Sequence, residues 1–426
     1  MLVAHLADTH LGIRPYGLAW AFEAFLEHFQ EAFEKALREH VNVIVLAGDL
    51  FDKPRPPNRA VKTVMDAVSK AREKGVRVYS VLGEHDLPKM AGEIPAQLLV
   101  RDMRVFTPRN PGPDCFTVDG IEYCVGGVSH RPLKYGEGQK KRLLEEIAKT
   151  VSALNNRSIL VLHQNISQFN MFEPGLDLSE LPRKPRYIAM GHIHRRITHR
   201  FSDGRLLAYP GSLDIVKRDE IELWRREGKG FYIVDLSGDE PRVEKVDIEP
   251  IPQALVKTSL DNLRVDVARA LKELPRDRES ILHVEVSLKI TEKTDVYAII
   301  RNLIRQHGGK VYYRVQKKYV DEAVKIDQSG TEKIDETEVI AELLGGRKYR
   351  DLAAKILELK KAVLAEDEQL VEKIIDEISV HPYWYTEAKI PQVLVKPPSP
   401  GGRSLGETRI QGKPKTGKKN LLSFLE

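Results

Sequence analysis

The sequence predicts an α/β protein built on a parallel sheet. Short apolar strands alternate with longer amphipathic segments over residues 2–82, which is the pattern of strand–helix–strand units. The clearest strand is residues 41–49, which is apolar, rich in β-branched residues and ended by Gly48 and Asp49. Ligands of open α/β sheets bind at this edge, so we expect Asp49 to lie at a functional site.

The N-terminal elements justify this assignment in order. Residues 2–7 form a first short strand, which ends in Asp8 and His10. A helix is expected over about 19–40, where four phenylalanines recur at helical spacing and are assigned to the core. Prolines 54–57 then break the chain before a second helix that runs to about residue 74. Residues 76–82 form the next strand, which ends in the run Gly83-Glu84-His85-Asp86.

Later strands of this first domain are also followed by polar residues. We expect a helix over 139–154 and strands over 158–162 and 187–190, which lead to His163 and to the pair His192 and His194. Further strands are expected over 206–209, 231–236 and 243–248. The prolines at 250 and 252 mark the end of the domain, so residues 1–250 form its predicted extent.

The remaining chain divides into three parts. Residues 251–330 read as a small α+β domain with strands near 281–290 and 310–315 and helices near 263–274 and 295–307. For residues 331–385 the sequence pattern predicts a helical hairpin with two apolar stripes. This hairpin is too small to bury a full core of its own. Residues 386–426 are rich in Pro, Gly, Lys and Ser and are expected to be disordered.

Composition and charge indicate the broad class of protein to which the chain belongs. The 426 residues are 42% hydrophobic and 30% charged, without an apolar run long enough to span a membrane. No basic segment of a signal peptide begins the chain, so a cytoplasmic protein is expected, with no membrane partner. The net charge of +5 is uneven, since residues 386–426 carry eight basic and three acidic side chains. Basic segments suit a polyanion, although solvated surface charge explains them equally well.

Cys115 and Cys124 flank a predicted hairpin. Asp119-Gly120 is a strong two-residue turn signal, and counting back from it places the two cysteines directly opposite each other. Two ligands are too few for a zinc site. Two free thiols and a cross-strand disulfide both remain open, and an intracellular disulfide is typical mainly of hyperthermophiles.

Five clusters of Asp, Glu and His follow five predicted strands. Carboxylate and imidazole ligands together suit Mn, Fe, Zn or a similar divalent ion. In Asp-x-His and His-x-His the side chains are two residues apart, so in extended chain they face the same way. A carboxylate shared between two ions is the arrangement that phosphate-ester hydrolases use. The seven candidate metal ligands are Asp8, His10, Asp49, Glu84, His163, His192 and His194.

These motifs resemble those of the calcineurin-like metallophosphoesterases. A narrower resemblance is to the archaeal Mre-eleven/SbcD nucleases of double-strand-break repair. The sequence motifs that carry it lie at residues 5–12, 47–52, 191–194 and 209–212. The resemblance implies a sandwich of two sheets flanked by helices. It also implies a small DNA-binding capping domain over 251–330 and a helical hairpin over 331–385 that binds the Rad-fifty ATPase through about 335–380.

The resemblance also implies residue roles and an activity. Asp8, His10 and His194 would hold a first ion, Asp49 would bridge, and Glu84, His163 and His192 would hold a second. His85 would stabilise or protonate the leaving group, oriented by Asp86. The expected activity is that of a DNA repair nuclease with two Mn(II) ions, a single-strand endonuclease and three-prime to five-prime exonuclease. A homodimer through the nuclease domain is expected as well.

Glu84 departs from the family, which has Asn at this position. A carboxylate oxygen can replace an amide oxygen as a ligand, but three carboxylates against two dications leave a net charge of +1 instead of +2. We therefore keep two alternatives: another metallophosphoesterase, acting as phosphatase or nucleotidase, and a scaffold whose catalysis Glu84 weakens.

The last residues suggest a docking peptide. The basic tail ends in an apolar cluster, and disordered tails rarely finish on such a cluster with nothing to bury it. The spacing of Leu421, Phe424 and Leu425 is similar to that of a peptide that binds a sliding clamp, although Lys418 stands where that pattern begins with Gln. Packing of the cluster on its own protein is the equal alternative.

Overall fold

The computed structural model describes residues 1–90, 92–133, 137–289, 294–320, 335–344, 346–364 and 368–379. The chain divides into two units, residues 1–322 and 323–426, which are treated separately below. The predicted disordered tail and the cluster of Leu421, Phe424 and Leu425 lie outside the described residues.

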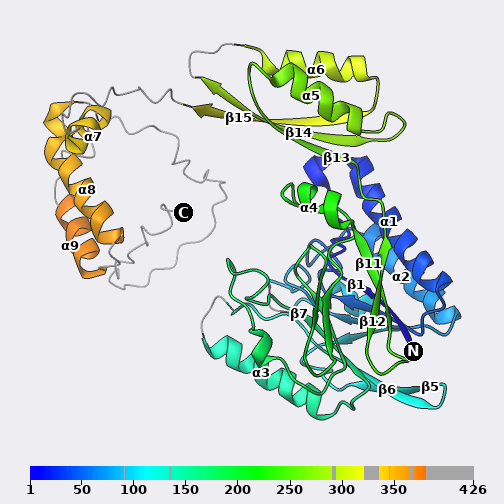
Figure 1. Ribbon diagram of the computed structural model, residues 1–426. Coiled ribbons are helices and arrows are strands. Elements are labelled where there is room, and N and C mark those ends of the chain that lie inside the picture. Colours follow the sequence, from blue (N-terminus) through cyan, green and yellow to red (C-terminus); the bar gives the residue numbers. More distant parts are fainter. Residues whose placement is uncertain are drawn as a thin grey trace, which may run out of the picture. The chain divides into compact units, whose positions relative to one another are not determined.

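Two six-stranded sheets form the centre of the first unit (Figure 1). In the first sheet, β1 to β4 are parallel to one another and β11 and β12 are antiparallel additions. Their bounds, in spatial order, are β12 (Arg242–Asp247), β11 (Gly230–Asp235), β1 (Leu2–Leu6), β2 (Val43–Ala47), β3 (Arg77–Val81) and β4 (Met103–Phe106).

The second sheet has a parallel centre and two antiparallel edges. Its spatial order is β5 (Asp114–Val118), β6 (Ile121–Val128), β7 (Ser158–His163), β8 (Tyr187–Gly191), β10 (Leu206–Tyr209) and β9 (Ile197–Arg200). Parallel strands carry loops at a common edge, so the residues that follow β1, β2, β3, β7 and β8 can meet.

Helices cover both outer faces of this sandwich. One cluster of buried residues lies between the sheets and draws on both of them, for example Val45 and Val161. A second cluster packs α1 (Ala19–Arg38) and α2 (Asn58–Glu73) on the first sheet, and it includes Phe22, Phe29 and Phe33. A third packs α3 (Glu137–Ser152) on the second sheet. The predicted two-sheet sandwich flanked by helices is confirmed.

Residues 253–320 form a separate three-stranded sheet within the same unit. Strands β13 (Gln253–Ser259), β14 (Ser280–Lys289) and β15 (Val311–Val320) alternate with α5 (Leu263–Glu273) and α6 (Val296–His307). All three strands are parallel, which differs from the expected α+β arrangement. The reason is that a helix joins each strand to the next, and such a crossover returns the chain in the same direction.

This small sheet packs on the two-sheet sandwich. Phe25 of α1 shares a buried cluster with Ile251 and Ile281, and the ring of Tyr16 stacks on Tyr312 with centroids 5.9 Å apart. Apolar contact of this kind explains why residues 1–322 form one unit.

The second unit is helical. Its described residues form α7 (Glu336–Leu344), α8 (Arg350–Leu364) and α9 (Glu368–Ser379), one helix more than the predicted hairpin. Among these described residues, the buried side chains are Ala341, Tyr349, Leu352, Ala353, Ala362 and Ile374. Within the described ranges of the whole chain, every helix is too short or too polar to cross a membrane.

The predicted hairpin joins β5 to β6. Asp119 and Gly120 both have positive φ, at 51° and 78°, as a tight two-residue turn requires. Cys115 and Cys124 are opposite each other in the register and are joined by a disulfide. Of the two alternatives that the sequence left open, free thiols and a cross-strand disulfide, the structure has the disulfide.

We predict that this disulfide is present in the isolated protein. Alkylation of the unreduced, denatured chain should modify neither Cys115 nor Cys124, and alkylation after reduction should modify both. Mass spectrometry distinguishes the two states. Two alkylated cysteines before reduction would show that the thiols are free.

Candidate metal centre

Five loops bring the predicted ligands together at one edge of the sandwich. Asp8 and His10 follow β1, Asp49 follows β2, Glu84 follows β3, His163 ends β7, and His192 and His194 follow β8. The backbone ties these loops to one another: the amide of Asp8 donates to the carbonyl of Gly48, and the amide of His192 donates to the carboxylate of Asp8 at 3.0 Å. The topology therefore assembles residues that are far apart in sequence.

The backbone is strained where these residues lie. Asp8, His10, Asp49 and His192 all have positive φ, at 50°, 44°, 46° and 102°, a region that non-glycine residues seldom adopt. Such strain is found at sites where the surrounding structure fixes a side chain for function. It is an independent sign that these loops are shaped for the site.

Two glycines make the close approach possible. A Cβ on Gly83 would lie 2.1 Å from an oxygen of Asp49, and one on Gly48 would lie 2.3 Å from Nδ1 of His163. Any larger residue at either position would displace a candidate ligand. The glycines of the Gly-Asp and Gly-Glu-His-Asp motifs thus have a steric role.

Asp8, His10 and His194 form the first candidate group, with ligand atoms within 4.8 Å of one another. Nε2 of His10 lies 3.1 Å from Nε2 of His194. Adjacent ligands of an octahedral ion with bonds of about 2.1 Å are separated by about 3 Å, so this pair suits a shared cation.

Asp49 lies at the centre of the cluster. One carboxylate oxygen accepts the backbone amide of His85 at 2.8 Å, and the other lies 3.4 Å from Nε2 of His163 and 3.8 Å from Nε2 of His10. Asp49 also groups with Asp8 and His163 as a second set of candidate ligands. Asp49 therefore lies between His10 and His163 and belongs with candidate ligands from both sheets.

Outer partners orient the histidine rings. Nδ1 of His194 contacts the carboxylate of Glu220 at 2.8 Å, and Nδ1 of His163 donates to the carbonyl of Ala47 at 2.8 Å. Metal-binding histidines characteristically use one ring nitrogen in this way and offer the other to the ion. Nε2 of His163 is buried and, among the described residues, has no hydrogen-bond partner.

The site has a strongly negative potential. Burial favours the neutral form of His163, but the carboxylates of Asp49 and Asp8 outweigh it and raise the pKa of His163 to about 10. Burial would raise the pKa of Asp49, yet the neighbouring His163, His10 and His85 hold it well below its usual range. Buried carboxylates that demand positive charge fit a site for divalent cations.

Glu84 belongs to a third group, together with His192 and Glu173. The second predicted set of Glu84, His163 and His192 is therefore divided between two neighbouring groups. The two groups touch, because the rings of His163 and His192 meet edge to face with centroids 5.3 Å apart. Glu84 itself is exposed at the rim of the site.

Asp86 does not have the partner that the sequence analysis expected. Its buried carboxylate accepts the backbone amides of Gly83, Leu50 and Phe51, which fixes the loops after β2 and β3. Burial and the charge of Asp49 raise its pKa to about 6. The ring of His85 instead donates from Nδ1 to the carbonyl of Asp52 at 2.8 Å. The expectation that Asp86 orients His85 directly is wrong.

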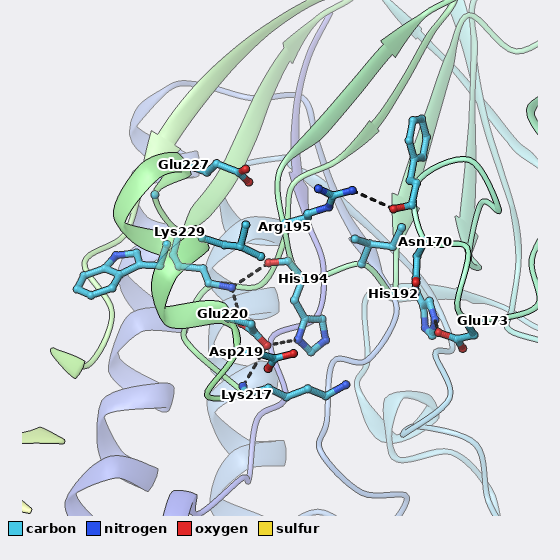
Figure 2. Close-up of a pocket in the computed structure, with 15 residues that line it drawn as sticks. Asn170, Glu173, His192, His194, Arg195, Lys217, Asp219, Glu220, Glu227 and Lys229 are labelled. Atoms are coloured by element: carbon cyan, nitrogen blue, oxygen red, sulfur yellow. Dashed lines mark hydrogen bonds and ion pairs between the residues drawn. The ribbon is translucent and has the colours of Figure 1, made fainter. Parts of the chain in front are cut away.

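A buried Glu–Lys pair supports the site from behind (Figure 2). Nζ of Lys229 lies 2.6 Å from Glu220 and donates to the carbonyl of His194 at 2.8 Å. Burial disfavours the Glu220 anion, but His194 and Lys229 lower its pKa to about 2. These residues line a cavity of about 370 Å³ that also borders His192 and Glu173.

Comparison with known protein families identifies the class of enzyme fold to which the first domain is similar. Residues 1–196 match the family model of the calcineurin-like phosphoesterases, which agrees with the two-sheet sandwich and its clustered ligands.

Several relatives are DNA double-strand break repair proteins called Mre11. The protein from Methanocaldococcus jannaschii is 36% identical over 58% of this chain and 67% of its own length. The proteins from Sulfurisphaera tokodaii and Saccharolobus solfataricus are each 30% identical, over 76% and 74% of this chain and 84% and 82% of their own. The chain belongs to the Mre11 family, as its motifs indicated.

The Glu220–Lys229 pair yields a stability prediction. Replacing Glu220 by Gln leaves the ammonium of Lys229 buried without a counter-charge, so we expect the free energy of unfolding to fall by about 3 kcal/mol. Glu222 is the matched control, since it lies on the same helix, α4 (Glu220–Glu227), with a side chain 70% exposed.

Glu222→Gln should change the free energy of unfolding by less than about 0.5 kcal/mol. Denaturant unfolding, followed by circular dichroism, measures both variants. Equal stability of the two variants would contradict a structural role for the buried pair.

Proposed function

We propose that this protein is a DNA repair nuclease that cleaves phosphodiesters with two divalent ions, Mn(II), as a single-strand endonuclease and three-prime to five-prime exonuclease. One observation carries the proposal above all: five strand-end loops converge around Asp49, which lies between His10 and His163. The relatives named for double-strand break repair supply the substrate class.

The ligand sets follow from the grouping of side chains. Asp8, His10 and His194 would hold the first ion, Asp49 would bridge, and Glu84, His163 and His192 would hold the second. When bound, the ions supply Lewis-acid activation of the phosphodiester and of the attacking water. The protein contributes their spacing, the orientation of the rings and the negative charge that retains them.

His85 is suited to handle the leaving group. Its Nδ1 donates to the carbonyl of Asp52, so Nε2 is the nitrogen that exchanges a proton with the substrate. The side chain is exposed beside His10, with ring centroids 4.8 Å apart, so it is accessible from solvent. Proton transfer from this position would assist departure of the DNA oxygen.

Substitution of Asp49 and of His85 should separate metal binding from chemistry. Asp49→Ala should abolish Mn-dependent DNA cleavage and reduce bound Mn, because it removes the bridge. His85→Ala should reduce cleavage about 10²–10⁴-fold with normal Mn content. Asp239→Ala, in an exposed turn, is the control. Cleavage at the parental rate by Asp49→Ala would refute the two-ion site.

Glu84 favours a second possibility, a scaffold with weakened catalysis. The exposed carboxylate adds negative charge where the family carries a neutral amide, so it opposes the approach of phosphate. A site of this composition is expected to hold metal more tightly and to acidify water less.

Glu84→Asn is therefore predicted to raise nuclease activity at saturating Mn. The assay compares single-stranded and double-stranded DNA and includes a phosphatase substrate, which tests for a general phosphoesterase. Glu93→Gln, a neutral replacement further along the same connection between β3 and the helix Ala96–Leu99, serves as the control. Equal or lower activity of the Asn variant would identify Glu84 as an adapted ligand.

Exposed apolar side chains support a homodimer through the nuclease domain. Met65 of α2, and Leu98 and Leu99 of the short helix Ala96–Leu99, are 42%, 47% and 54% exposed. Large exposed apolar side chains are characteristic of protein interfaces. We assign these side chains to the contact with a second copy of the chain.

The helical unit is assigned to the Rad-fifty ATPase. Among the described residues, its small core leaves Ile356, Leu359 and Ile378 only half-buried, so apolar side chains remain available for a partner. Residues 335–380 would dock near the base of the coiled coil of the ATPase. The predicted clamp contact through Leu421, Phe424 and Leu425 remains a proposal, as does association with the nucleoid.

A pull-down tests the ATPase contact. A chain that ends at residue 322, where the first unit ends, should lose the Rad-fifty ATPase and keep its Mn-dependent nuclease activity. Undiminished capture of the ATPase by the shortened chain would place the contact on the first unit instead.

A further inference from the structure

The loop after β7 brings one more carboxylate to the metal centre. The side-chain amide of Asn165 donates to the carbonyls of Asn170 and Glu173, at 2.9 and 2.6 Å, and the amide of Leu176 donates back to the carbonyl of Asn165 at 2.9 Å. These bonds fold residues 165–176 into a braced loop. Figure 2 shows Glu173 of this loop directed at the ring of His192.

The distance between Glu173 and His192 suits two ligands of one ion. Oε2 of Glu173 lies 3.0 Å from Nε2 of His192, nearly the separation of the two ring nitrogens of His10 and His194. Neighbouring ligands around an octahedral cation with bonds of about 2.1 Å have this spacing. Each histidine of the His-x-His motif therefore has another candidate ligand nearby. Glu173 lies 3.0 Å from His192, and His10 lies 3.1 Å from His194.

Glu84 completes the group. One ligand atom each from Glu84, Glu173 and His192 lies within 4.8 Å of the others. Two carboxylates so close repel each other unless a positive charge separates them.

The group adjoins the neighbouring set of candidate ligands. The ring of His163 lies edge to face against that of His192, with centroids 5.3 Å apart, so the two groups border each other. Nε2 of His163 is fully buried, forms no hydrogen bond within the described chain and lies 3.4 Å from a carboxylate oxygen of Asp49. This nitrogen therefore belongs to the set of Asp8, Asp49 and His163, and Glu173 stands next to that set through His192.

We propose that Glu173 is a ligand of the second cation in this protein, together with Glu84 and His192. The inference rests on the two-ion site proposed above. It changes the charge of the centre, because Asp8, Asp49, Glu84 and Glu173 together balance two dications. The second ion is held at the rim by carboxylates from two different loops, and the braced loop 165–176 becomes part of the metal site.

Titration of the metal-free full-length chain with Mn tests the proposal. Calorimetry, with metal content measured after dialysis, should find two ions per chain. Glu173→Gln keeps the size of the side chain and removes its charge, so it should weaken one ion at least about tenfold and leave the other unchanged. Glu240→Gln, which neutralises a carboxylate 60% exposed and paired with Arg200, should bind both ions normally.

Each result has a distinct meaning. Two ions bound with parental affinity by Glu173→Gln would overturn the role of Glu173 and leave the two-ion site intact. Fewer than two ions in the parental protein would overturn the two-ion site, and the assignment with it. In crystals loaded with Mn, an anomalous scattering peak bonded to Glu173 would support the proposal, and two peaks that both lie away from its carboxylate would overturn it.

Discussion

The buried carboxylate of Asp49 is the interaction on which the site depends. It accepts the amide of His85 from the loop after β3, and it lies beside His10 from the loop after β1 and His163 from β7. One side chain thus joins loops from both sheets. Its charge, taken out of water, needs compensating positive charge, because an uncompensated buried ion costs several kcal/mol. Protonated histidine or bound cations meet that need, and only cations do so while leaving the histidines as ligands.

The sandwich supplies the rigidity that this charge requires. Strands β1, β2 and β3 are parallel neighbours in one sheet, and β7 and β8 are parallel neighbours in the other. All five end at the same edge, and the apolar cluster between the sheets fixes their separation. Positive φ at Asp8, His10, Asp49 and His192 shows that the packed strands, and not local preference, determine these loops.

The fold and the clustering of the candidate ligands were predictable because they depend on patterns that recur along the chain. Buried parallel strands are continuous apolar runs, and a polar motif directly after each run is visible without a structure. Glu173, Glu220 and Lys229 follow no such rule. Glu220 begins a short helix and Glu173 lies in an irregular loop, so each resembles an ordinary surface residue until folding places it beside a histidine.

For Asp86, the sequence predicted a contact that the structure does not contain. Its place next to His85 in the motif suggested a direct partnership, but neighbouring residues in a turn point in different directions. Its carboxylate binds three backbone amides instead, and this sets the path of the loop that carries Glu84 and His85. Adjacency in sequence is therefore a poor guide to contact in a loop, whereas spacing along a strand is a good one.

Residues 217–220 connect the metal centre to the small sheet. Glu220 holds His194, and Arg218, two residues earlier, pairs with Glu285 of β14 at 2.9 Å and contacts Gln316 of β15 at 2.8 Å. The amide of Lys217 donates to Glu220, which stiffens the segment between these contacts. A displacement of the small sheet relative to the sandwich must either break the Arg218–Glu285 pair or strain the segment that orients His194. The placement of the small sheet and the orientation of His194 are thus mechanically linked through four consecutive residues.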